Sequence, residues 1–267
     1  MTDSSPRVIA TDLDGTIVRS DGTISERTVA ALARVERAGA TLVMVTGRPP
    51  RWMKQIAEAV DHHGVAICAN GAVLYDLHTE TVLRTEEIPP PVIAETVGRL
   101  RSVAPELRFA VEHPDGFVFE KSYLLGRWDA KALGGRAVDF AELVGRSGTK
   151  LLAFDPEADP DVLSEKATAA VGDLVTVTHS SGRGLLEMSA PSVTKASALA
   201  ALCTERGLTS DAVVAFGDMP NDLPMLTWAG TSYGVANAHP LVLAAVTHKT
   251  SRNDEDGVAE VLERLFP

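Results

Sequence analysis

Near its start the chain reads Val8-Ile9-Ala10-Thr11-Asp12-Leu13-Asp14-Gly15-Thr16. The run before Asp12 is short, apolar and rich in β-branched residues, which is typical of a buried strand. Two aspartates one residue apart and a Gly-Thr turn follow it directly. Because open α/β sheets bind ligands outside the carboxyl ends of their strands, Asp12 and Asp14 are candidates for a functional site.

Two carboxylates held this close repel each other, which leaves three interpretations of the pair. A divalent cation could lie between them, and Mg²⁺ is the expected ion because it prefers oxygen ligands. One carboxyl could instead stay protonated beside its neighbour and serve as an acid. Asp-x-Asp also occurs in ordinary turns, but the position between a hydrophobic strand and Gly15 favours a function.

The composition is that of a globular, acidic protein. The 267 residues are 45% hydrophobic, enough for one large domain or two modest ones. The net charge of −11 and the pI near 5.1 argue against nucleic acid and an anionic membrane surface as partners. No apolar run is long enough for a membrane span, and residues 1–7 lack the apolar stretch of a signal peptide. With only two cysteines no disulfide framework is expected, and we expect a cytoplasmic location.

Strand and helix signals alternate in the first part of the chain and again near its end. Apolar strands are predicted at 41–45, 65–69 and 212–216, each followed by polar residues or glycine, with amphipathic helices between them. This alternation predicts an α/β fold with a Rossmann-like parallel sheet and right-handed crossovers. The strand ends therefore converge at one edge of the sheet.

The pattern changes between these two parts. Residues 85–186 mix helical segments with short alternating strands, which predicts an inserted α+β domain. The core domain is then formed by residues 1–84 and 187–267.

Polar side chains follow each core strand. Thr46, Asn70 and Asp218 stand at strand ends, and Lys195 begins a predicted helix. Taken alone, Thr46 could be a helix cap, Lys195 a solvated surface residue and Asp218 a turn residue. Together with Asp12 and Asp14, these residues form a set that contains a nucleophile, an acid/base partner, a metal ligand, a hydroxyl donor and a fixed cation.

That set resembles the haloacid dehalogenase superfamily of phosphohydrolases, in particular its Cof-type branch with a type IIB cap. The resemblance covers essentially the whole chain and is carried by four motifs: Asp12-Leu13-Asp14-Gly15-Thr16, Thr46-Gly47-Arg48, Lys195, and Gly217-Asp218-Met219-Pro220-Asn221-Asp222. Two departures stand out. Ala196 follows the motif lysine where the family often has glycine, and Val235-Ala236-Asn237-Ala238 replaces a Met-Gly-Asn-Ala stretch.

The resemblance implies a role for each motif residue. Asp12 attacks phosphorus and forms an aspartyl-phosphate, and Asp14 is the general acid and base. The Mg²⁺ cofactor binds Asp12, Asp218 and the backbone carbonyl of Asp14. The remaining roles are less closely defined. Phosphate is bound by Leu13, Thr46, Gly47, Lys195 and Asn221. Beside these motif roles, we expect Arg48, Asn70, Arg183 and Asp222 to support the site or to contact substrate.

We therefore predict a Mg²⁺-dependent phosphatase of small phosphorylated metabolites, with sugar phosphates or related monoesters as the substrate class. One alternative with the same chemistry is a phosphomutase or phosphotransferase, in which a substrate hydroxyl replaces water. Another is a non-catalytic phosphoryl-accepting module, against which the second aspartate and the large insertion argue. The oligomeric state is left open.

Overall fold

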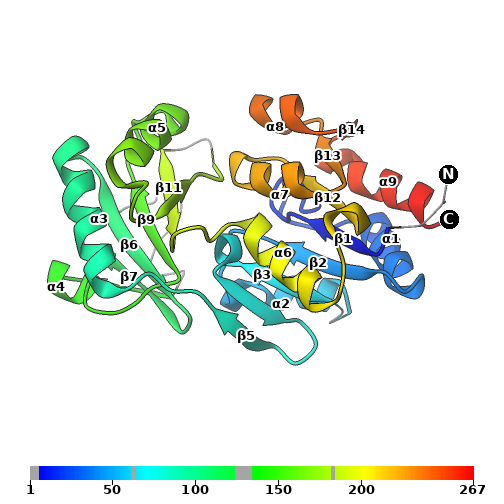
Figure 1. The fold of residues 1–267 in the computed structure, drawn as a ribbon, viewed down its shortest axis with the longest axis horizontal. Coiled ribbons are helices and arrows are strands. Elements are labelled where there is room, and N and C mark those ends of the chain that lie inside the picture. Colours follow the sequence, from blue (N-terminus) through cyan, green and yellow to red (C-terminus); the bar gives the residue numbers. More distant parts are fainter. Residues whose placement is uncertain (1–5, 62–63, 124–133, 182–183) are drawn as a thin grey trace. The chain divides into compact units, whose positions relative to one another are not determined.

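A computed structural model describes residues 6–61, 64–123, 134–181 and 184–267. The chain divides into two compact units (Figure 1). The first unit combines Met1–Arg84 with Thr194–Pro267, and the second consists of Thr85–Val193. Among the described residues, no helix combines the length and the apolar character that crossing a membrane requires.

The first unit is built on an eight-stranded sheet with strand order β14-β13-β12-β1-β2-β3-β4-β5. The strands are β1 (Val8–Thr11), β2 (Thr41–Val45), β3 (Val65–Cys68), β4 (Val73–Asp76), β5 (Thr81–Thr85), β12 (Val213–Gly217), β13 (Thr231–Val235) and β14 (His248–Thr250). The six strands from β14 to β3 are parallel, and β4 is antiparallel to β3. The predicted α/β class with a parallel core sheet is confirmed.

Helices flank this sheet (Figure 1). They are α1 (Glu26–Arg37), α2 (Lys54–Ala59), α6 (Lys195–Glu205), α7 (Leu223–Trp228), α8 (Pro240–Ala245) and α9 (Gly257–Leu265). Helix α1 packs against α9, and α6 packs against α7. The start of α1 follows from its sequence, because the Ser25 side chain accepts a hydrogen bond from the Thr28 N–H as an N-cap.

The central position of β1 follows from its composition. All four of its residues are buried, as expected for a parallel strand whose two faces are both covered. Ala10 pairs with Val43 of β2 on one side and with Ala215 of β12 on the other. This register brings Asp12 out at the same edge as the residues that follow β2 and β12.

The second unit carries a six-stranded mixed sheet with strand order β10-β11-β9-β6-β7-β8. The strands are β6 (Arg108–His113), β7 (Gly116–Glu120), β8 (Gly135–Val138), β9 (Lys150–Phe154), β10 (Thr176–Thr178) and β11 (Leu185–Ser189), and the helices are α3 (Pro90–Val103), α4 (Phe140–Leu143) and α5 (Pro160–Val171). Helices α3 and α5 bury Ile93, Val97 and Leu163 in one apolar cluster with residues of the strands. Phe117, Phe119 and Phe154 belong to a second cluster.

The second unit ends later than the sequence pattern suggested. The predicted core resumed at residue 187, whereas the structural division falls between Val193 and Thr194. The reason is that β11 pairs antiparallel with both β9 and β10, so its residues belong to the six-stranded sheet.

Candidate active site

The carboxyl ends of four neighbouring strands carry the candidate residues. Asp12 follows β1, Thr46 follows β2, Asn70 follows β3 and Asp218 follows β12. All four residues are buried. The predicted convergence at one sheet edge is therefore present, because these strands are consecutive and parallel in the sheet.

Lys195 supplies a buried positive charge at this edge. Its side chain is 0% exposed, and Nζ lies 2.6 Å from Asp12 Oδ1 and 2.6 Å from Asp222 Oδ1. Lys195 is the first residue of α6, where Thr194 and Ser197 form a capping box that fixes the start of the helix. The interpretation of Lys195 as a solvated surface residue is wrong, because two carboxylates hold it inside the protein.

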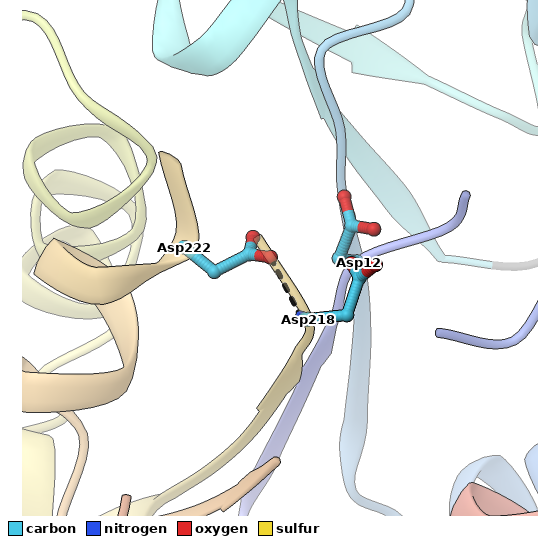
Figure 2. A group of neighbouring side chains, drawn as sticks. All are labelled: Asp12, Asp218 and Asp222. Carbon is cyan, nitrogen blue, oxygen red and sulfur yellow. Dashed lines mark hydrogen bonds between the residues drawn. The ribbon is translucent and has the colours of Figure 1, made fainter. Parts of the chain in front are cut away.

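Asp222 uses both of its carboxylate oxygens within the protein. Oδ1 accepts from Lys195, and Oδ2 accepts from the backbone N–H groups of Asp218 and Met219, each at 3.0 Å. Figure 2 shows the Asp222 carboxylate directed at the Asp218 backbone. Asp222 thereby orients both Lys195 and the loop after β12.

Asp12, Asp218 and Asp222 form a group with the donor chemistry of a divalent-cation site (Figure 2). One carboxylate oxygen of each lies within 4.8 Å of those of the other two. Because the oxygens of Asp222 are already engaged, Asp12 and Asp218 are the better ligand candidates. Such an all-oxygen donor set fits Mg²⁺. The Asp14 side chain does not join this group. The metal contact predicted for Asp14 is made by its backbone carbonyl oxygen, and it stays a prediction.

The Gly15 turn leaves space for the Asp218 carboxylate. Gly15 has φ +81°, and a Cβ at this position would lie 2.3 Å from Asp218 Oδ2. Thr16 Oγ1 donates to the other oxygen, Asp218 Oδ1, at 3.2 Å. Both the backbone conformation and the close approach therefore require glycine after Asp14.

Burial and mutual repulsion act on the carboxyl groups. Burial raises the pKa of Asp12 to about 7; the Lys195 charge opposes this shift and the Asp222 charge adds to it. Burial also raises the pKa of Asp218, helped by the charges of Asp12 and Asp222. Burial alone would lower the pKa of Lys195, but Asp12 and Asp222 together hold it above its usual value. The site thus carries more negative charge than Lys195 alone neutralises, which favours a bound cation.

This arrangement makes stability depend on pH when no divalent metal is added. The folded pKa of Asp12 lies above its unfolded value near 4, so its stabilising contribution is lost as pH rises through about 7. Between about pH 4 and pH 7, we therefore expect the midpoint of thermal unfolding to fall by more in the wild type than in Asp12→Asn. The measurement is calorimetry in the presence of a chelator. Parallel curves for the two proteins would contradict this expectation.

The Asp14 side chain lies outside the buried carboxylate group. It is 58% exposed and binds Arg48 through two hydrogen bonds, from Nε to Oδ2 at 2.7 Å and from Nη2 to Oδ1 at 2.5 Å. The Arg48 N–H in turn donates to Thr46 Oγ1 at 3.0 Å. The first two motifs are therefore joined by an ion pair between residues that lie 34 positions apart.

The remaining predicted residues differ in their placement. Leu13 is buried, and its carbonyl accepts from the N–H groups of residues 16, 17 and 18. Gly47 lies between Thr46 and Arg48 in the turn after β2. Asn221 donates through Nδ2 to Asn70 Oδ1 at 3.0 Å. Arg183 lies outside the described residues.

Asn237 has a structural role that the four motifs do not indicate. Asn237 Nδ2 donates to the Gly15 carbonyl at 2.8 Å, and its Oδ1 accepts from the Asn253 N–H at 2.9 Å. Asn253 Nδ2 also binds the Val18 carbonyl. These contacts tie the turn after Asp14 to the segment before α9. The available signal was Asn237 itself, the asparagine retained in the Val235–Ala238 stretch.

Comparison with known proteins relates the chain to a family that includes phosphatases. The model of the haloacid dehalogenase-like hydrolase family matches residues 9–262. The chain is 25% identical to the 5-amino-6-(5-phospho-D-ribitylamino)uracil phosphatase YitU of Bacillus subtilis, over 99% of both chains. It is 27% identical to the pyridoxal phosphate phosphatase YbhA of Escherichia coli, over 96% of this chain and 97% of that protein. The crystal structure of SMU.1108c from Streptococcus mutans superposes with a TM-score of 0.86 at 24% identity, covering 97% and 98% of the two chains.

Proposed function

Because the chain belongs to the haloacid dehalogenase-like hydrolases and is a phosphatase of that superfamily, we propose that it hydrolyses small phosphate monoesters through an aspartyl-phosphate on Asp12. The observation that carries the proposal is the buried Lys195, held 2.6 Å from both Asp12 and Asp222. A cation fixed against a buried carboxylate is what a site needs in order to accept a phosphoryl dianion next to an anionic nucleophile.

The substrate class is proposed from the two relatives. One is a phosphatase of a ribityl-uracil phosphate and the other of pyridoxal phosphate, so both accept a phosphate monoester on a small, polar metabolite. We propose the same class here, with sugar phosphates included. The net charge of −11 makes the local cations Lys195 and Arg48 important for attracting such anions.

In the first step, an oxygen of Asp12 attacks phosphorus in line with the ester oxygen. The Asp12 O–P bond forms as the ester P–O bond breaks, and Asp14 donates a proton to the leaving oxygen. In the second step, Asp14 takes a proton from water, and the water oxygen attacks phosphorus. The Asp12 O–P bond then breaks, which releases phosphate and restores the carboxylate.

The surrounding residues bind and orient the phosphoryl group. Lys195 opposes the rise in the pKa of Asp12 and holds its carboxylate in place. The Thr46 hydroxyl accepts from the Arg48 N–H and can donate to a phosphoryl oxygen. A Mg²⁺ ion held by Asp12 and Asp218 would neutralise phosphoryl charge as a Lewis acid. Arg48 holds the Asp14 carboxylate beside the site through its two hydrogen bonds.

The role of Asp14 predicts a leaving-group dependence. In Asp14→Asn, protonation of the leaving oxygen is lost, so kcat/KM should fall about 100-fold or more for alkyl phosphates and far less for nitrophenyl phosphate. Nitrophenolate leaves without a proton, so phosphoenzyme should still form and then break down slowly. Equal losses on the two substrates, measured by steady-state kinetics, would contradict acid/base catalysis by Asp14.

The proposed function is tested by phosphate release from a panel of phosphorylated metabolites. The panel includes sugar phosphates, pyridoxal phosphate and nucleoside monophosphates, each assayed with wild type and Asp12→Asn in Mg²⁺. Turnover by the wild type that disappears in the variant supports the proposal. A wild type that releases phosphate only when a sugar bisphosphate is added would instead indicate a phosphomutase. Phosphorylation of Asp12 without repeated release of phosphate would indicate a phosphoryl-accepting module.

A further inference from the structure

The turn after β3 has a backbone conformation that side chains disfavour. Ala69, Asn70 and Gly71 are consecutive residues with φ of +50°, +57° and +112°. Glycine adopts positive φ readily and asparagine tolerates it, but alanine does not. Such strain persists only where surrounding contacts enforce it, and it concentrates at functional sites.

The contacts that enforce this turn come from the phosphate-binding segments. The Ala69 N–H donates to the Arg48 carbonyl at 2.9 Å, and the Asn70 N–H donates to the Thr46 carbonyl at 3.0 Å. On its other side the turn meets the start of α6 so closely that a Cβ on Gly71 would lie 2.3 Å from the Thr194 carbonyl oxygen. The turn is therefore fixed between the Thr46 segment and Lys195.

The Asn70 side chain extends this connection to the fourth motif. Asn70 Oδ1 accepts from Asn221 Nδ2 at 3.0 Å, although the two residues lie 151 positions apart. Asn70 follows β3 and Asn221 lies beyond β12, and β1 and β2 separate these two strands in the sheet. The amide pair thus spans the edge from which Asp12 and Thr46 project.

Each amide of the pair keeps one buried polar atom without a hydrogen-bond partner among the described residues. These atoms are Asn70 Nδ2 and Asn221 Oδ1, in residues that are 3% and 6% exposed. Buried polar groups in native proteins are normally satisfied, so each atom calls for a ligand or water. Asn70 Nδ2 is a donor, and a phosphoryl dianion offers only acceptors. Asn221 Oδ1 is an acceptor and cannot pair with such oxygens.

We propose that Asn70 is a substrate-binding residue whose Nδ2 donates a hydrogen bond to an oxygen of the phosphoryl group. The strained turn fixes where the amide points. Asn221 positions Asn70 by donating to its Oδ1, a contact separate from the phosphate contact that the resemblance implies for Asn221. This inference rests on the proposed phosphatase function and extends it to a residue outside the four motifs. The backbone of the Asn70 turn also contacts both the Thr46 carbonyl and Thr194, the residue before Lys195.

Three variants separate the amide from the backbone. Asn70→Asp keeps the shape and the acceptor for Asn221 Nδ2 but replaces the free donor by an oxygen. Asn70→Gly removes the amide and suits the positive φ, whereas Asn70→Ala removes the same amide and strains the turn. Inhibition by inorganic phosphate, with nitrophenyl phosphate as substrate, reports phosphoryl binding. Thermal unfolding reports the backbone.

Loss of a hydrogen bond to a charged group should weaken phosphate inhibition by about tenfold or more in all three variants. Asn70→Gly and Asn70→Ala should share one inhibition constant while Asn70→Ala unfolds at a lower temperature. Unchanged phosphate inhibition in folded Asn70→Asp would overturn the proposal. So would a loss in Asn221→Asp without one in Asn70→Asp, because the donor would then be Asn221. A wild type with no phosphatase activity would instead refute the proposed function.

Discussion

Asp12→Asn is expected to lower turnover at least 100-fold, which corresponds to a barrier increase of about 2.7 kcal/mol or more. The carboxamide has nearly the same shape and can still accept from Lys195 Nζ through its oxygen, but it is a poor nucleophile. The measurement is phosphate release from nitrophenyl phosphate at saturating substrate and Mg²⁺.

A matched control separates chemistry from folding in this variant. Thermal unfolding in Mg²⁺ should show Asp12→Asn folded at the assay temperature, and Glu263→Gln should retain full activity. Glu263 lies on α9 in a partly exposed ion pair with Arg27, away from the strand ends that carry the site. Residual turnover by Asp12→Asn above one hundredth of the wild-type rate, in preparations that do not deamidate, would contradict covalent catalysis by Asp12.

Removal of divalent metal is expected to abolish activity as completely as the loss of Asp12. Asp12, Asp218 and Asp222 place three buried carboxylates against the single ammonium of Lys195, so a phosphoryl dianion would meet an excess of negative charge without a cation. EDTA should reduce turnover below detection, and Mg²⁺ should restore it. Phosphate release is measured before and after dialysis into metal-free buffer.

The choice of ion sharpens this prediction. Ca²⁺ accepts more ligands in a looser geometry, so it should bind the site and inhibit in the presence of Mg²⁺. Asp218→Asn should raise the Mg²⁺ concentration needed for activity, because this variant removes one charged ligand candidate. Full activity in EDTA, or with Ca²⁺ alone, would contradict the metal requirement.

Local patterns were sufficient to predict four strands of the first sheet, β1, β2, β3 and β12, and the polar residues at their ends. The apolar run before Asp12 and the polar residues after β2, β3 and β12 identified the sheet edge, because period and strand-end chemistry are local properties of the chain. The ion pair of Asp14 with Arg48 and the hydrogen bond of Asn70 with Asn221 join residues 34 and 151 positions apart. Nothing in the neighbourhood of either residue specifies its distant partner.

The later boundary of the second unit has a similar cause. The predicted boundary after residue 186 cuts through β11 (Leu185–Ser189). Only the pairing with β9 and β10 assigns this strand to the six-stranded sheet. Register is a tertiary property, set by which neighbouring strands bury the same face. The Asn-Gly pair at 70–71 is a known turn signal, but it does not specify the αL conformation that Asn70 adopts.

The central claim is that Asp12 carries the phosphoryl group between substrate and water. The most direct test is rapid acid quenching of Asp14→Asn during turnover of nitrophenyl phosphate, followed by peptide mass spectrometry. We expect one phosphoryl group on the peptide that contains Asp12, formed within a single turnover in Mg²⁺ and absent in Asp12→Asn. A phosphoryl group on another residue, or nitrophenol release with no phosphoenzyme at any quench time, would contradict the account.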